Sequence, residues 1–131
     1  MPTVSDYTTI LGSGERVTIG DGNPVWEDTF GTAGRDTGQQ DTHILVEFYG
    51  LTQGKVAEVK INNQTLGRLA GYANEEYGNE NRHTQILSFP DEHLNDGRNE
   101  IQINAVESDS SDSTYDDFTI ENMVCMFHQR A

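Results

Sequence analysis

Apolar and polar residues alternate in several short stretches of this chain, and Gly, Asn and Asp separate these stretches. Within 43–49, Ile44, Val46 and Phe48 occupy alternate positions on one face, and Leu45, Glu47 and Tyr49 fall on the other. A period of two residues is typical of a β-strand that buries one face. No segment sustains the period of an α-helix, so the pattern predicts an all-β protein.

The same pattern predicts eight or nine strands joined by turns. Gly12-Ser13-Gly14 is interpreted as the turn of a first hairpin, and Asn62-Asn63 as the turn of a second, because asparagine tolerates the positive φ angles of tight hairpins. Pro90 ends a strand. This number of short strands fits two packed antiparallel sheets, a β-sandwich or jelly roll, in a single domain over residues 1–131. The predicted strands are 7–11, 15–19, 26–30, 43–49, 55–61, 64–69, 82–89, 99–106 and 118–128.

Charge changes this picture most among the compositional features. The chain has 22 Asp and Glu residues against 8 Lys and Arg, a net charge of −14, and Lys55 and Lys60 are its only lysines. At about 1 M salt the Debye length falls to about 3 Å, which screens the self-repulsion of such a chain. The composition therefore predicts a protein of a high-salt environment, of haloarchaeal type. The alternative is an acidic domain of a non-halophile.

Three partners or locations are disfavoured by the same composition. Binding to nucleic acid depends on Lys and Arg that displace counterions, and these residues are scarce. Membrane insertion by a helix needs about 18 consecutive apolar residues, which the chain lacks. The first residues form neither a basic nor an apolar stretch, so no secretory signal is expected. A virus particle or the cytoplasm is the expected location.

Three segments of the second half resemble the galactose-binding-like jelly roll, a fold found in many carbohydrate-binding modules. The segment from Val56 to Gly67 is similar to the family's strand, Asn turn and Gly hairpin. The segment from Phe89 to Ile101 is similar to its Leu, Gly, Asn and aliphatic pattern, and that from Asp117 to Val124 to its closing strand. The resemblance implies the fold and permits a sugar site on loops and a structural calcium, but transfers no site residue.

Aromatic and acidic residues gather in the loop 70–81. A glycan-binding loop combines aromatic faces with carboxylates in this way, and Trp26 would add a stacking surface. The alternative is a solvated acidic loop. The candidate glycan-binding residues are Trp26, Tyr72, Glu75, Glu76 and Tyr77.

A second acidic segment, 107–117, concentrates oxygen ligands of the kind that calcium prefers. The spacing lacks the order of an EF-hand loop, so a mobile acidic loop is the alternative. No cofactor is required by any other pattern. The candidate calcium ligands are Asp109, Asp112, Asp116 and Asp117.

The last predicted strand has apolar residues at both its even-numbered and its odd-numbered positions. If Phe118, Ile120, Val124 and Met126 face the core, then Met123, Cys125 and Phe127 form a second apolar face. One interpretation is a subunit interface formed by these three residues in a homo-oligomer or other assembly. The other is a central strand covered by the N-terminal segment.

No catalytic constellation stands out. Cys125 lies in an apolar run without a basic neighbour that would lower its pKa, and no nucleophile elbow or phosphate loop is present. The sequence therefore predicts a non-catalytic module, either a structural or decorating component of an assembly such as a haloarchaeal virus particle, or a carbohydrate-binding module.

Overall fold

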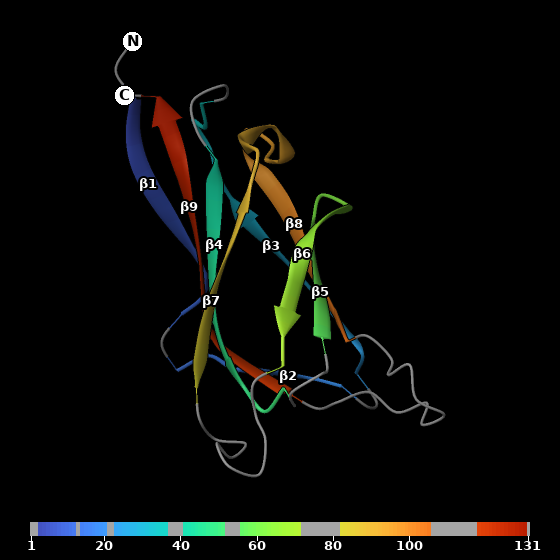
Figure 1. Cartoon of the computed structure of the whole chain (residues 1–131). Coiled ribbons are helices and arrows are strands. Elements are labelled where there is room, and N and C mark those ends of the chain that lie inside the picture. The colour runs from blue at the N-terminus through green and yellow to red at the C-terminus, as the bar shows by residue number, and fades with distance from the viewer. Residues whose placement is uncertain are drawn as a thin grey trace.

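The computed structural model describes residues 3–12, 14–20, 23–36, 41–51, 56–71, 82–105 and 118–130. These residues form two antiparallel sheets packed face to face, so the predicted β-sandwich is confirmed (Figure 1). The described residues contain one turn of 3-10 helix, Asp91–His93, and no α-helix. None of their helices is long and apolar enough to cross a membrane.

One sheet has the strand order β1-β9-β4-β7, with β2 also paired to β9, and the other has the order β3-β8-β5-β6. All described pairs are antiparallel. The strands are β1 Thr3–Leu11, β2 Val17–Ile19, β3 Val25–Gly31, β4 Thr42–Tyr49, β5 Val56–Ile61, β6 Gln64–Ala70, β7 His83–Phe89, β8 Arg98–Ala105 and β9 Phe118–Arg130.

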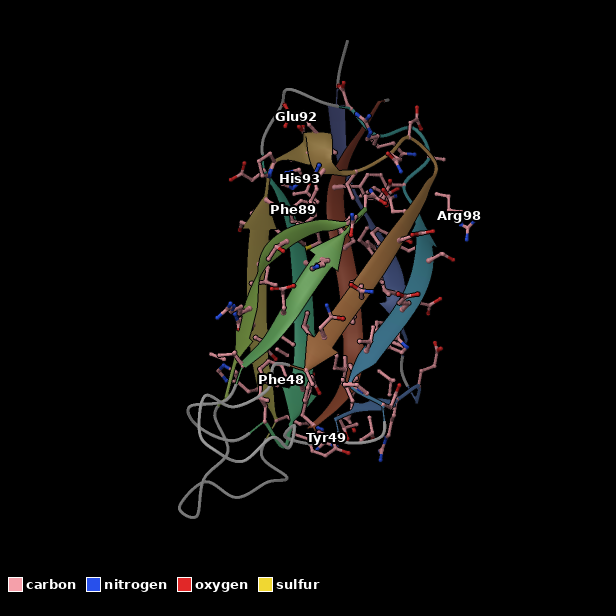
Figure 2. All side chains as sticks on the ribbon, turned by 90° about the vertical axis from the view of Figure 1, so that its right-hand side faces the viewer. Phe48, Tyr49, Phe89, Glu92, His93 and Arg98 are labelled. Atoms are coloured by element: carbon pink, nitrogen blue, oxygen red, sulfur yellow. The ribbon has the colours of Figure 1, made fainter. Side chains whose placement is uncertain are left out.

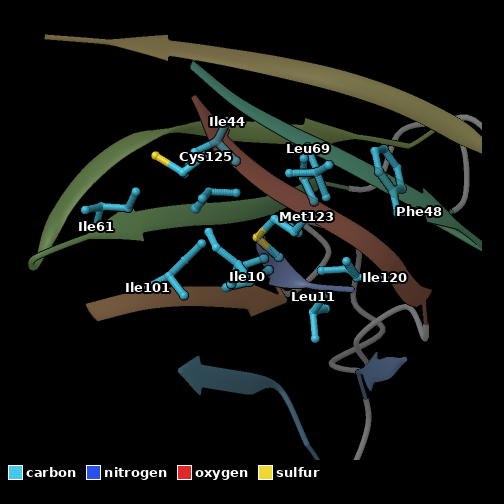
Figure 3. Packing of buried hydrophobic residues seen from close by; sticks show 14 of the residues in the cluster. Ile10, Leu11, Ile44, Phe48, Ile61, Leu69, Ile101, Ile120, Met123 and Cys125 are labelled. Carbon is cyan, nitrogen blue, oxygen red and sulfur yellow. The ribbon is translucent and has the colours of Figure 1, made fainter. Parts of the chain in front are cut away.

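The core lies between the two sheets and is built from the predicted alternation. Strand β4 buries Ile44, Val46 and Phe48 and turns its intervening side chains outward. Strands β5 and β8 bury their aliphatic residues at every second position in the same way. Figure 3 shows side chains from both sheets meeting in this layer. Burial of this apolar surface supplies the main driving force for folding.

The two predicted hairpin turns have different outcomes. Asn62 and Asn63 have φ angles of 50° and 67° and join β5 to β6, as expected. The first predicted hairpin is wrong, because β1 and β2 do not pair with each other. Both pair with β9, β1 along 123–130 and β2 along 118–120, so the chain around Gly12 interrupts one long edge instead of reversing it.

Strand β9 contains a bulge at the same level. Opposite β4, Glu47 pairs with Asn122 and Phe48 with Ile120, so Glu121 is the additional residue. A bulge of one residue exchanges the two faces of the strand beyond it. Ile120 faces the core on one side of the bulge and Met123 faces it on the other.

The side-chain amide of Gln85 links the two sheets between β7 and β6, which are not paired with each other. Gln85 of β7 donates from Nε2 to the Arg68 carbonyl at 2.8 Å and accepts from the Ala70 amide at 3.1 Å. It thereby satisfies backbone groups of β6, a strand of the other sheet.

A buried polar network connects segments at one end of the sandwich, the end that carries the 3-10 turn and lies at the top of Figure 2. Asn99 is fully buried and donates from Nδ2 to Thr32 Oγ1 at 2.7 Å and to the Gly97 carbonyl at 3.2 Å. Its Oδ1 accepts from the Asn95 amide at 2.7 Å and from Asn62 Nδ2 at 2.9 Å. The amide therefore uses both of its donor hydrogens and both acceptor positions.

Replacement of Asn99 by Ala is expected to lower the free energy of unfolding by about 2–4 kcal/mol, because several buried partners lose their hydrogen bonds at once. Urea unfolding in about 2 M KCl, where the charge is screened, measures the change. Asn104→Ala on the same strand is the control, expected to change stability by less than about 0.5 kcal/mol. Equal effects of the two substitutions would contradict the role of the network.

Candidate functional site

The final strand presents a different outer face from the one expected. Met123 and Cys125 are fully buried and Phe127 is 5% exposed, all three in the core. Figure 3 shows Met123 and Cys125 among residues of both sheets. The expectation that these side chains form the outward face is wrong, because the bulge at Glu121 shifts the alternation by one residue.

The outward apolar residues of β9 are instead Val124 and Met126, which are half-buried and not part of the core. The sheet register aligns Val124 with Leu45 of β4, and Leu45 with Ile86 of β7. Met126 is aligned with Tyr7 of β1. Directly paired residues of antiparallel strands project from the same face of a sheet.

We call these five side chains the apolar face: Tyr7, Leu45, Ile86, Val124 and Met126. Tyr7 is 65% exposed and Ile86 is 55% exposed, two of the three most exposed large apolar side chains in the described part of the chain. The third, Val25, lies on β3 in the other sheet. The apolar face therefore spans all four long strands of the five-stranded sheet on its outer side.

A group of ion pairs borders the apolar face. Arg82 donates from Nε and Nη2 to the two carboxylate oxygens of Glu121, the Nη2 bond being 2.8 Å long. Arg16 lies 3.3 Å from Glu121 and Arg82 lies 3.7 Å from Glu47. The guanidinium of Arg82 also lies 5.2 Å from the ring centre of Tyr49, a cation–π distance.

We call Arg16, Glu47, Arg82 and Glu121 the charge cluster. The bulge places the side chain of Glu121 within reach of both arginines, and Glu121 is only 9% exposed. The hydrogen bonds from Arg82 lower the pKa of Glu121, and the positive charges of Arg82 and Arg16 act in the same direction against partial desolvation. Two positive and two negative side chains leave the cluster without net charge.

The outer side of the four-stranded sheet carries a groove with a volume of about 370 Å³. Gln102 donates to Glu27 at 2.6 Å across β8 and β3, and Lys60 lies 3.4 Å from Glu58 along β5. We call this the polar groove; its lining includes Glu27, Thr29, Lys60, Arg98, Glu100 and Gln102. Carboxylates, amides and cations line it, so it offers both donors and acceptors of hydrogen bonds.

The structure describes only Trp26 among the predicted glycan-binding residues. Trp26 is half-buried and packs against the core, and it is not among the residues that line the polar groove. Tyr72, Glu75, Glu76 and Tyr77 lie outside the described residues, as do Asp109, Asp112, Asp116 and Asp117. Both the glycan-binding loop and the calcium site stay predictions. Over the described ranges, no group of three or more His, Cys, Asp or Glu side chains has the arrangement of a metal site.

Cys125 has the chemistry of a core residue. Burial raises the pKa of its thiol to about 12, because the thiolate would lose its hydration. The reactive thiolate is therefore scarce at neutral pH.

Sequence reasoning missed the charge cluster and the polar groove. Arg16, Arg82 and Glu121 are more than 30 residues apart along the chain, and the cluster depends on the bulge that brings them together. The polar pair Glu121-Asn122, set between apolar residues on both sides, was the signal from which the bulge could have been found. The polar groove depends on pairing across β3, β8 and β5, which alternation within one strand does not reveal.

No protein-family model matches the chain, and no curated protein matches it by sequence. Solved structures do match. A segment of dimeric latent PorU from Porphyromonas gingivalis superposes with a TM-score of 0.64 at 7% identity over 98% of this chain. A segment of the VP2 protein of infectious bursal disease virus superposes with a TM-score of 0.54 at 11% identity, also over 98%.

This chain spans only 13% of the PorU chain and 32% of the VP2 chain. At these identities the likeness establishes the β-sandwich fold alone. The carbohydrate-binding module CBM36, solved with calcium and xylotriose, covers 96% of this chain with 11% identity and a TM-score of 0.47. A score this low carries no inference about this chain.

The lowered pKa of Glu121 gives a pH-dependent contribution to stability. The ionised carboxylate is favoured by folding, so the contribution is present above the unfolded pKa and is lost as the pH falls through the folded pKa. A carbon-detected NMR titration is expected to show protonation of Glu121 below the ordinary glutamate range. Arg82→Gln should raise that midpoint, whereas Arg68→Gln in the other sheet should leave it unchanged. A midpoint insensitive to Arg82 would refute the assigned cause.

Proposed function

We propose that this protein is a non-catalytic structural module that joins a larger protein assembly through its apolar face, as a structural or decorating component of a virus particle of the haloarchaeal type. The observation that carries the proposal is the apolar face itself. An apolar patch of a few hundred Å² is about the largest that soluble monomers expose, and such a patch is often an interaction site. Here Tyr7 and Ile86 are exposed beside three half-buried apolar side chains, on a chain whose net charge is −14.

The position of the apolar face supports docking of another protein. A sheet face with Leu45, Val124 and Ile86 in one aligned row offers a flat surface suited to a second sheet or to a scaffold. The buried, weakly acidic thiol of Cys125 supports a role without catalysis. The fold shared with a segment of the VP2 protein is compatible with a place in a particle.

The acidic surface supports a high-salt setting. The excess of carboxylates would repel within the folded chain in dilute buffer and be screened in concentrated salt. A structural component that works at high salt gains solubility from this charge, while the apolar face supplies the contact.

Photo-crosslinking in the cells or particles that contain the protein tests this function. A benzophenone amino acid at position 86 is expected to give a covalent product with another protein chain, because Ile86 lies on the docking surface. The same amino acid at position 25 is the matched control, since Val25 is 44% exposed on the opposite sheet. Comparable products from both positions, or none from position 86, would contradict a docking role for the apolar face.

The polar groove favours a second candidate function, the binding of an uncharged glycan. Its carboxylates and amides offer acceptors and donors for hydroxyl groups, and the acidic surface disfavours anionic polymers. The groove is open and lies across three strands, so a chain of sugars would fit along it.

Replacement of Glu27 and Glu100 by Ala is expected to weaken retention by a neutral polysaccharide at least about tenfold, equivalent to about 1.4 kcal/mol, if the groove binds glycan. Affinity electrophoresis against a panel of neutral polysaccharides measures the retention. Glu47→Ala on the other sheet should leave it unchanged. Loss of retention with Tyr72→Ala and Tyr77→Ala instead would assign the site to the loop, and the absence of retention by every polysaccharide would exclude this function.

A further inference from the structure

We infer that the partner of the apolar face is a second copy of this chain, and that two copies pack their five-stranded sheets face to face around a two-fold axis. This inference rests on the proposed docking role of the face and names its occupant. It follows from the symmetry of the strand order, the local balance of charge, and the size of the surface.

The strand order β1-β9-β4-β7 makes the face complementary to itself. A two-fold axis that runs along the boundary between β9 and β4 places β9 over β4 of the second copy, and β1 over β7. Val124 then lies over Leu45 of the other copy. Tyr7 and Ile86, the two most exposed large apolar side chains of the described residues, lie on opposite edge strands. Tyr7 of each copy therefore contacts Ile86 of the other, which gives two such contacts in the dimer.

In the proposed dimer, the long side chain of Tyr7 extends toward the neighbouring row. Tyr7 stands in the row of Met126 and Ile86 stands in the row of Val124, two residues apart along β9, which is about 7 Å. Sheets packed face to face cross at about −30°, and this crossing shifts the contacts of edge strands along their length. A single apolar contact between Tyr7 and Ile86 on each side of the axis therefore spans the offset.

The local charge balance permits self-association through this face. Two copies with a net charge of −14 repel each other, so a contact between them requires a surface that adds no further repulsion. On the outer side of the five-stranded sheet, Arg16 and Arg82 balance Glu47 and Glu121 at close range. The remaining long-range repulsion is screened by salt.

The size of the face predicts a weak dimer. Four strands spaced by about 4.8 Å and two rows spaced by about 7 Å give an area on the order of 300 Å² for each copy. A standard stable interface buries about 800 Å² for each partner. The association is therefore expected to be reversible and to depend on concentration and on salt.

The native mass of the full chain, measured by multi-angle light scattering from about 10 μM to 1 mM, tests the inference. In about 2 M KCl the mass is expected to rise from one chain to two, and the dissociation constant should be at least about tenfold larger at 0.15 M. Ile86→Asp and Tyr7→Asp should each keep the mass at one chain. Val25→Asp adds the same charge to the opposite sheet and should dimerise like the unchanged protein.

Circular dichroism of each variant confirms that it is folded before its mass is interpreted. A mass of one chain at every concentration and both salt levels would overturn the second-copy inference, and so would a dimer that survives Ile86→Asp. An equal loss with Val25→Asp would overturn it as well. If position 86 then crosslinks to a different protein in native material, the proposed docking function stands without the dimer; if it crosslinks to nothing, both fail.

Discussion

The one-residue bulge in β9 decides which side chains of the last strand face the core and which face outward. It inserts Glu121 between two stretches of regular alternation, and it directs Ile120 on one side and Met123 on the other into the same core. Without the additional residue, strict alternation would bury Asn122 in place of Met123. Burial of an amide without partners costs free energy, whereas burial of Met123, Cys125 and Phe127 contributes to the core. The bulge thus allows the strand to bury apolar side chains on both sides of the polar pair Glu121-Asn122.

The same bulge connects the core to the surface chemistry. It lies where the paired edge changes from β1 to β2, and it brings the Glu121 carboxylate within reach of Arg16 and Arg82. The arginines neutralise a nearly buried carboxylate and also balance the charge beside the apolar face. As a result, Val124 and Met126 project outward on a locally neutral part of a strongly acidic protein. Both the packing of the core and the outward position of Val124 and Met126 therefore follow from the one-residue bulge at Glu121.

Much of the fold could be predicted from the sequence, because β4, β5 and β8 alternate without interruption and Asn62-Asn63 encodes its turn locally. The first hairpin could not, since the Gly12 segment is compatible with a reversal and only the pairing of β1 and β2 with β9 excludes it. The apolar second face of the last strand was predicted correctly in kind, but its residues were exchanged by the bulge. The polar groove and the charge cluster arise from register between distant strands, which a single sequence does not specify.

We propose that the outer side of the five-stranded sheet is covered in the working state of the protein. Methyl NMR with a soluble paramagnetic agent in about 2 M KCl tests it most directly, because the agent broadens the signals of methyl groups that it can approach. Ile86 and Val124 are expected to lose this broadening as the protein concentration rises, while Val25 stays broadened throughout. Broadening of Ile86 and Val124 that does not change with concentration, in the pure protein and in its native assembly, would contradict the account.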